Sequence, residues 1–217
     1  AAQAETMKFP GASAAMKWIN KNQPEDLTVE GKFKPDELLK VRNAMPEGSE
    51  FHFNATWGDV VYSDESTEVI LGKKNVSEAQ LEALISLCPN LKLIDNSKNT
   101  QPSNDVMIPL TEKYPDSHFE WVVNLGKGHR IATNAQPFTT KLPPESDKQL
   151  TSEKLQHLKY CPTLKALDIG HNKVTDLDFL KYVPDLELLI IGDNDVTDIT
   201  PIGQLKHLQF AELFSIS

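Results

Sequence analysis

The chain lacks the features of a membrane-spanning, nucleic-acid-binding or enzymatic protein. Its longest apolar stretches, such as residues 186–191, are far shorter than the ~20 residues of a spanning helix. Acidic residues outnumber basic ones by 31 to 22, and no block of lysine and arginine is present, so a phosphate backbone would be repelled. Phosphate-binding loops and nucleophile-elbow motifs are also missing. We therefore expect no membrane-spanning segment, no nucleic-acid partner, no catalytic residues and no cofactor.

Cysteine is nearly absent as well, with 2 among 217 residues. Cys88 and Cys161 each precede a proline and hold the same place in two related segments. At least two strand-like segments separate them, and neighbouring strands are ~4.8 Å apart. That separation exceeds the ~7 Å that a disulfide tolerates between Cα atoms. We expect two buried, unreactive thiols, each closing a helix before the next strand.

What the chain does contain is a repeat with a period of 22 residues, headed by Leu164, Leu186 and Leu208. The first two copies read L-x-x-L-x-I-x-x-N-x-V, and the third breaks off early. The alternating apolar residues predict a short strand with one face in a core. The asparagines, Asn172 and Asn194, are expected to tie their side-chain amides to the turning backbone of neighbouring coils.

This pattern resembles the leucine-rich repeat family, whose signature is L-x-x-L-x-L-x-x-N/C-x-L at a period of about 20 to 29 residues. The whole chain also resembles large bacterial repeat proteins of gut Firmicutes, most specifically over residues 150–217. The resemblance implies an α/β fold, a curved solenoid with a parallel sheet on its concave side. Helices would line the convex side, shortening to 3₁₀ turns in the last repeats. It also implies a secreted or cell-surface binding protein, although residues 1–5 are not an intact signal peptide.

The repeats extend upstream in a less regular form and suggest three regions. Residues 1–26 form an N-terminal segment with a capping helix, residues 27–149 form irregular coils with inserted hairpins, and residues 150–217 form the regular repeats. The third regular repeat is incomplete, and its apolar strand has no polar cap. We expect either a fragment of a longer array or end-to-end association through residues 208–217.

Helices and hairpins are indicated between the upstream coils. Apolar periodicity predicts helices over residues 11–22, 35–45 and 77–87. Residues 45–53 resemble residues 114–121, which indicates an internal duplication. In both copies a glycine-containing turn and a second extended stretch follow, so two hairpins projecting from the solenoid are predicted. Two apolar pairs, at Leu27 and Val29 and at Phe51 and Phe53, stand 24 residues apart.

One segment resembles a functional motif without matching it, and the histidines form no motif. Residues 193–198 alternate carboxylates as calcium loops do, but lack the glycine at the sixth position and the distal glutamate. A role in capping the convex turns explains them better. The six histidines have no metal-ligand spacing, so no metal site is expected. A hydrolase that uses His129 of the second hairpin with nearby carboxylates remains an alternative.

The concave positions are the better candidates for function. Residues two, four, six and seven places after the first leucine of each repeat are expected to point away from the core. They form an apolar stripe flanked by acids, which is typical of a recognition patch. The alternative is that these aliphatics serve strand formation alone. The predicted partner-binding residues are Asp168, Leu188, Ile190, Phe210, Glu212 and Phe214.

The sequence thus predicts a non-enzymatic module that binds a protein or peptide on its concave sheet. The alternative function is a structural spacer within a larger bacterial surface protein, with no ligand of its own.

Overall fold

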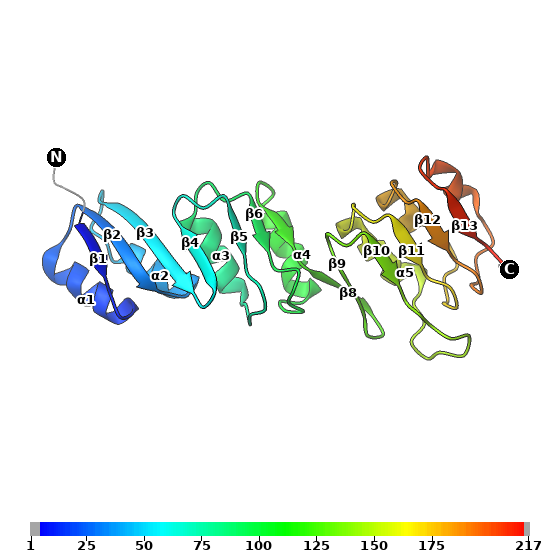
Figure 1. Cartoon of the computed structure of the whole chain (residues 1–217), viewed down its shortest axis with the longest axis horizontal. Helices are drawn as coiled ribbons and strands as arrows, with labels where there is room; N and C mark the ends of the chain where they lie inside the picture. The colour runs from blue at the N-terminus through cyan, green and yellow to red at the C-terminus, as the bar shows by residue number, and fades with distance from the viewer. Residues whose placement is uncertain (1–4, 215–217) are drawn as a thin grey trace. The chain divides into compact units, whose positions relative to one another are not determined.

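The computed structural model describes residues 5–214, which belong to two compact units, Ala1–Phe119 and Glu120–Ser217. Both units consist of short strands connected through helices (Figure 1). The change to regular repeats expected at residue 150 falls inside the second unit. Within the described residues, no helix is long and apolar enough to cross a membrane.

The first unit begins with a four-stranded sheet of order β1-β2-β3-β4. Its first three strands are parallel, and the connecting helices α1 and α2 lie where the apolar periodicity predicted them. Strand β1 was not predicted, because its four residues are largely exposed and carry no apolar alternation. The elements are β1 (Glu5–Lys8), α1 (Ala12–Asn22), β2 (Asp26–Lys32), α2 (Pro35–Asn43), β3 (Glu50–Trp57) and β4 (Val60–Ser63).

The first hairpin is part of this sheet and does not project from it, which corrects the prediction. Strand β4 pairs antiparallel with β3 after a turn at Gly58, whose φ is 63°. Val60 and Tyr62 are buried, and the Tyr62 hydroxyl donates to the Phe33 carbonyl at 3.0 Å. Because β4 occupies the edge of β3, no further parallel strand can pair there. The single continuous parallel sheet that the resemblance implied is therefore interrupted.

A second sheet of the first unit has the order β5-β6-β7. Helix α3 begins at its predicted place, where Ser77 and Gln80 form a capping box of two hydrogen bonds. Helix α4 was not predicted, because Pro109 lies inside it; the helix buries Met107 and Leu110. The elements are β5 (Glu68–Ile70), α3 (Glu78–Leu87), β6 (Leu93–Asp95), α4 (Asn104–Lys113) and β7 (His118–Glu120).

The second unit begins with the second predicted hairpin, β8 (Val122–Gly126) and β9 (His129–Ala132). Its tight turn is made by three consecutive residues with positive φ, 85°, 53° and 88° at positions 126, 127 and 128. The inward side chains of the hairpin are buried in the core of the unit, so this hairpin does not project freely either. These residues are Val123, Leu125 and Ile131.

The strands of the regular repeats and β10, which precedes residue 150, form a four-stranded parallel sheet of order β10-β11-β12-β13. On the other side of the coils, the chain forms one short α-helix and three 3₁₀ helices, as the resemblance implied. The core residues Leu167 and Leu189 are fully buried. The elements are β10 (Pro137–Thr139), α5 (Ser152–Leu155), η1 (Gln156–Tyr160), β11 (Ala166–Asp168), η2 (Asp178–Tyr182), β12 (Leu188–Ile190), η3 (Thr200–Gln204) and β13 (Phe210–Glu212).

Both cysteines are buried free thiols, which confirms the prediction. Cys88 is the C-cap of α3 and Cys161 is the C-cap of η1. Burial raises the pKa of each thiol to about 12. Their place in the repeat is therefore structural.

Candidate functional site

The coils of the second unit are held together by buried asparagine side chains. Asn194 accepts the Val174 amide at 3.0 Å and donates to the carbonyls of Ile169 and Ile191, both at 2.9 Å. Asn172 accepts the Leu150 amide at 2.7 Å in the same way. Each asparagine thus satisfies backbone groups of two consecutive coils, as predicted. These ties fix the register of the strands and hold the outward side chains in columns.

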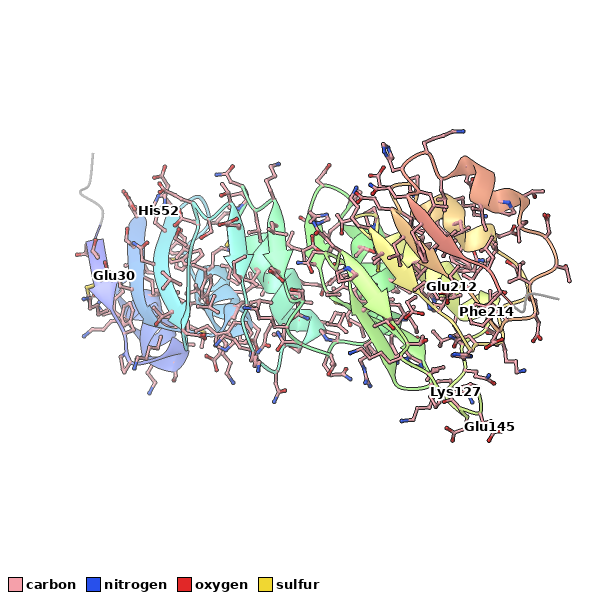
Figure 2. The ribbon with its side chains drawn as sticks, turned by 45° about the vertical axis from the view of Figure 1, so that its right-hand side comes forward. Glu30, His52, Lys127, Glu145, Glu212 and Phe214 are labelled. Atoms are coloured by element: carbon pink, nitrogen blue, oxygen red, sulfur yellow. The ribbon has the colours of Figure 1, made fainter. Side chains whose placement is uncertain are left out.

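The six predicted partner-binding residues lie on one face of the β11-β12-β13 sheet and just beyond its last strand. Register places Leu188 beside Phe210, and it places Ile190 between Asp168 and Glu212. Figure 2 shows Glu212 and Phe214 close together on this part of the chain. The alternate residues point into the core. We call this outward side the open face, defined by Asp168, Leu188, Ile190, Phe210, Glu212 and Phe214.

The apolar residues of the open face differ in exposure. Phe210 and Phe214 are 51% and 52% exposed. Leu188 and Ile190 are only partly exposed, because β12 has a strand on each side whereas β13 is the last strand of the described sheet. The exposed part of the expected stripe is therefore aromatic and concentrated along β13.

A cavity of about 270 Å³ lies at the carboxyl ends of these strands. Four residues of the open face line it, while Leu188 and Phe210 lie nearer the opposite ends of the strands. The residues around the cavity are Lys141, Leu142, Asp168, Gly170, His171, Ile190, Gly192, Glu212 and Phe214.

Two glycines shape the floor of this cavity. A Cβ atom added to Gly192 would lie 2.8 Å from Cε1 of Phe214. The absence of a side chain at Gly192 thus lets the Phe214 ring lie against the backbone of the preceding coil. Gly170 holds the equivalent place one coil earlier, where an added Cβ would meet the Gly192 carbonyl oxygen at 3.5 Å. The missing side chain at position 192 therefore makes room for an aromatic ring.

The polar groups of the cavity are held in fixed positions. Asp168 accepts hydrogen bonds from the Gly170 amide at 3.2 Å and from the Thr139 hydroxyl at 2.9 Å. Nδ1 of His171 lies 2.8 Å from a carboxylate oxygen of Asp193, at ion-pair distance but without the alignment of a hydrogen bond. His171 and Asp193 have left-handed φ angles of 59° and 52°. Because both oxygens of Asp168 accept hydrogen bonds, its carboxylate has little freedom to move beside the cavity.

Sequence reasoning missed Lys141 and Leu142 as cavity residues. They follow β10 in a segment without a repeat pattern. Lys141 has a φ of 50°, and no repeat signal marks it. A usable signal existed for His171, because Asp193 follows it by the repeat period of 22 residues.

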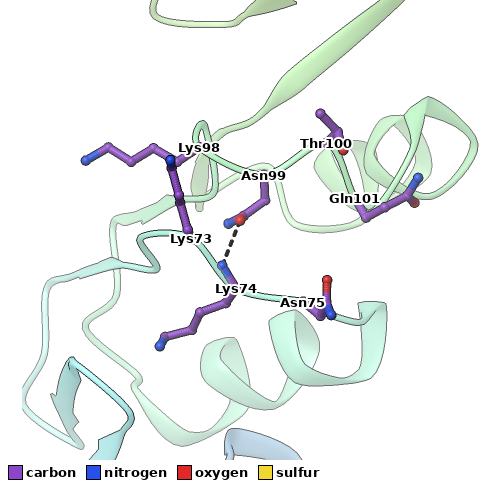
Figure 3. Close-up of a pocket in the computed structure, with 7 residues that line it drawn as sticks. All are labelled: Lys73, Lys74, Asn75, Lys98, Asn99, Thr100 and Gln101. Carbon is purple, nitrogen blue, oxygen red and sulfur yellow. Dashed lines mark hydrogen bonds between the residues drawn. The ribbon is translucent and has the colours of Figure 1, made fainter.

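A larger pocket of about 420 Å³ in the first unit is lined by lysines and amides (Figure 3). Its central contact is structural: Asn99 accepts the Lys74 amide at 2.8 Å and so joins two coils. The ammonium group of Lys74 is held by Asp59 at 2.5 Å. In Figure 3 the side chains of Lys74 and Lys98 extend away from Gln101. The polar groups around this pocket do not converge on one point, so we do not assign it a ligand.

Asp198 of residues 193–198 and His129 of the second hairpin both have structural partners. Asp198 accepts the Thr200 amide at 2.8 Å at the start of η3, and this hydrogen bond lowers the pKa of Asp198. Asp198 thus supports the turn that leads into η3, one residue before the N-cap residue Ile199. Nε2 of His129 lies 2.9 Å from the carbonyl oxygen of Lys148, so a backbone group orients this imidazole.

The second unit combines a 22-residue period, in-register parallel strands and buried asparagines that join consecutive coils. These are the features that the leucine-rich repeat resemblance implied for residues 150–217.

Comparison with known proteins adds little to that geometry. No protein-family model matches the chain, and no curated protein matches its sequence. Among solved structures, internalin C2 from Listeria monocytogenes is similar with 13% identity and a TM-score of 0.35, over 83% of this chain and 92% of that one. Internalin F from the same organism is similar with 16% identity and a TM-score of 0.28, over 94% of this chain and 50% of that one. At these values no conclusion about partners follows.

Proposed function

We propose that the open face of the second unit binds an extended peptide or a protein surface, without catalysis. The observation that carries the proposal is a pair of exposed aromatic side chains on the open face, Phe210 on β13 and Phe214 in the lining of a preformed cavity. Aromatic anchors next to a pocket are the features that dominate the energetics of protein recognition. The strands beneath them are fixed by the asparagine ties, so binding would order few new groups.

The charge of the open face favours a partner with basic groups. Asp168 and Glu212 flank Ile190 in the same row of the sheet. The chain as a whole carries a net charge of −9. Complementary charge speeds association and selects partners more than it strengthens binding. A peptide with an apolar side chain between basic residues fits this row best.

The proposal is tested by selecting peptides against the whole chain from a random library displayed on phage. Selected peptides are then measured against Leu188→Glu and Phe210→Glu. Both substitutions put a charge on the open face and should weaken binding at least about tenfold, since each removes an apolar contact. The matched control is Val61→Glu in the first unit, where the native side chain is 75% exposed and apolar.

Circular dichroism of each variant establishes that the fold is retained. Retained binding by both open-face variants, or an equal loss in the Val61 control, would refute the proposal.

A second candidate is a spacer module within a larger surface protein, secreted or surface-attached as the sequence resemblance implies. It is favoured by Ala211, which is exposed although the equivalent Leu167 and Leu189 are fully buried. The inner side of β13 is thus open to a covering element.

One such element is a second copy of the chain joined end to end through residues 208–217. Residues 215–217 of that segment lie outside the described residues. Light scattering over a range of concentrations tests the association: a mass that stays monomeric throughout would argue against it.

A further inference from the structure

Three side chains of types that bind metal ions lie close together at the beginning of strands β2 and β3 in the first unit. Asp26 stands opposite Glu50 in the register, and His52 lies two residues further along β3 on the same face. One ligand atom of each lies within 4.8 Å of the others. Figure 2 shows His52 at the rim of this sheet. The arrangement offers one imidazole nitrogen and two carboxylates to a single point.

The imidazole of His52 is oriented by a fourth residue. Its Nδ1 lies 2.8 Å from one oxygen of Asp64, and the other oxygen accepts the Phe53 amide at 3.0 Å. Asp64 is therefore fixed by the backbone, and Nε2 of His52 is left on the side of Glu50, 4.0 Å from its carboxylate. A carboxylate behind a histidine is the usual outer-shell arrangement of metal sites, because it sets the tautomer and the ring orientation.

Asp26 provides an independent indication. Its Oδ1 atom is inaccessible to solvent and has no hydrogen-bond partner. Among residues 5–214, no lysine or arginine forms an ion pair with Asp26, Glu50 or Asp64. A buried carboxylate oxygen without a partner is costly. A cation bound by the Asp26 carboxylate would offset part of that cost.

The internal duplication shows that the fold itself does not require this histidine. In the second copy, Thr133 accepts the Trp121 amide at 3.0 Å and pairs with Glu120. Thr133 thus holds the place of Asp64, and Glu120 holds the place of His52. The same backbone tie is built there without an imidazole.

We propose that Asp26, Glu50 and His52 bind one divalent transition-metal ion of the zinc class, with Asp64 as the positioning residue. One imidazole nitrogen and two carboxylate oxygens are ordinary zinc ligands, and solvent completes the coordination. The imidazole disfavours magnesium and calcium, which prefer oxygen ligands. The site belongs to the first unit and is independent of binding at the open face.

Isothermal titration of the tag-free whole chain with zinc chloride tests the site. We expect one zinc ion per chain, at least tenfold weaker binding in His52→Ala, and a loss of about tenfold in Asp64→Asn. The matched control is His207→Ala, because His207 is also an exposed histidine beside a carboxylate, with Nε2 3.7 Å from Asp185. Its zinc affinity should equal that of the unsubstituted chain.

Glu50→Gln serves as a second variant that should retain the fold, because the Glu50 side chain is 74% exposed. It too should weaken zinc binding at least tenfold. Cobalt replacing zinc should give visible absorption bands that disappear in His52→Ala. The proposal is overturned if the chain binds no zinc, if zinc binds equally well to His52→Ala and Glu50→Gln, or if magnesium competes as strongly as zinc.

Discussion

Asn172 and Asn194 donate to one shared acceptor, the carbonyl oxygen of Ile169, each at 2.9 Å. The first bond lies within one coil and the second crosses to the next. A single backbone carbonyl therefore connects two successive repeats. The positions of the strands, and hence the columns of the open face, depend on these side chains.

Asn194→Ala should lower the free energy of unfolding of the second unit by about 3 kcal/mol, because it leaves several buried backbone groups unsatisfied at about 1–3 kcal/mol each. Urea denaturation monitored by circular dichroism measures the change. Asn75→Ala is the control, since Asn75 is exposed. Equal stability of the two variants would show that the tie contributes little.

Gly192→Ala should displace the Phe214 ring, because the added Cβ would lie within 3.0 Å of three ring atoms. The cost in stability should be below about 1 kcal/mol, since Phe214 is half exposed and free to turn. The affinity for a selected peptide should fall severalfold. Gly203→Ala provides the control, with no heavy atom within 4 Å of its added Cβ. An unchanged affinity in Gly192→Ala would show that the position of the Phe214 ring does not contribute to peptide binding.

Both thiols should resist modification in the folded protein. Burial raises the pKa of Cys88 and of Cys161 to about 12, so almost no thiolate exists near neutral pH. A chromogenic disulfide reagent should react slowly with the native chain and rapidly, at two thiols per chain, in denaturant. Rapid reaction of the native protein would contradict the buried placement.

His157 should make the second unit less stable in mild acid. Burial lowers the pKa of His157, and the neighbouring Lys154 and Lys159 lower it further. The unfolded state therefore binds the proton first as the pH falls through 6.5, and stability declines with it. Urea midpoints measured at about pH 7.5 and about pH 5 should differ less in His157→Gln than in the unsubstituted chain. An identical pH dependence in both proteins would rule out this contribution.

The sequence predicted the regular part of the molecule well, because a fixed period determines strand register. The spacing of 22 residues places Leu188 beside Phe210, as the structure has it. Register also underlies the proposed metal site: the 24-residue offset between β2 and β3 puts Asp26 opposite Glu50. The offset is visible in the sequence, but no local pattern marks Asp26, Glu50 and His52 as residues of one cluster.

What the sequence could not predict depends on edges and long-range packing. Strand β4 covers the edge of β3, and no local pattern distinguishes a hairpin that joins a sheet from one that projects. The exposure of Phe210 compared with Leu188 follows from which strand is last in the sheet. Lys141 enters the cavity through an irregular connection whose path is set by tertiary contacts.

The most direct test of the central claim is a nuclear magnetic resonance titration of the methyl-labelled chain with a selected peptide. Binding at the open face should shift the methyl signals of Leu188 and Ile190, while those of Val61 and Ile70, exposed apolar residues of the first unit, stay in place. Shifts confined to Val61 and Ile70, with Leu188 and Ile190 unchanged, would contradict the account.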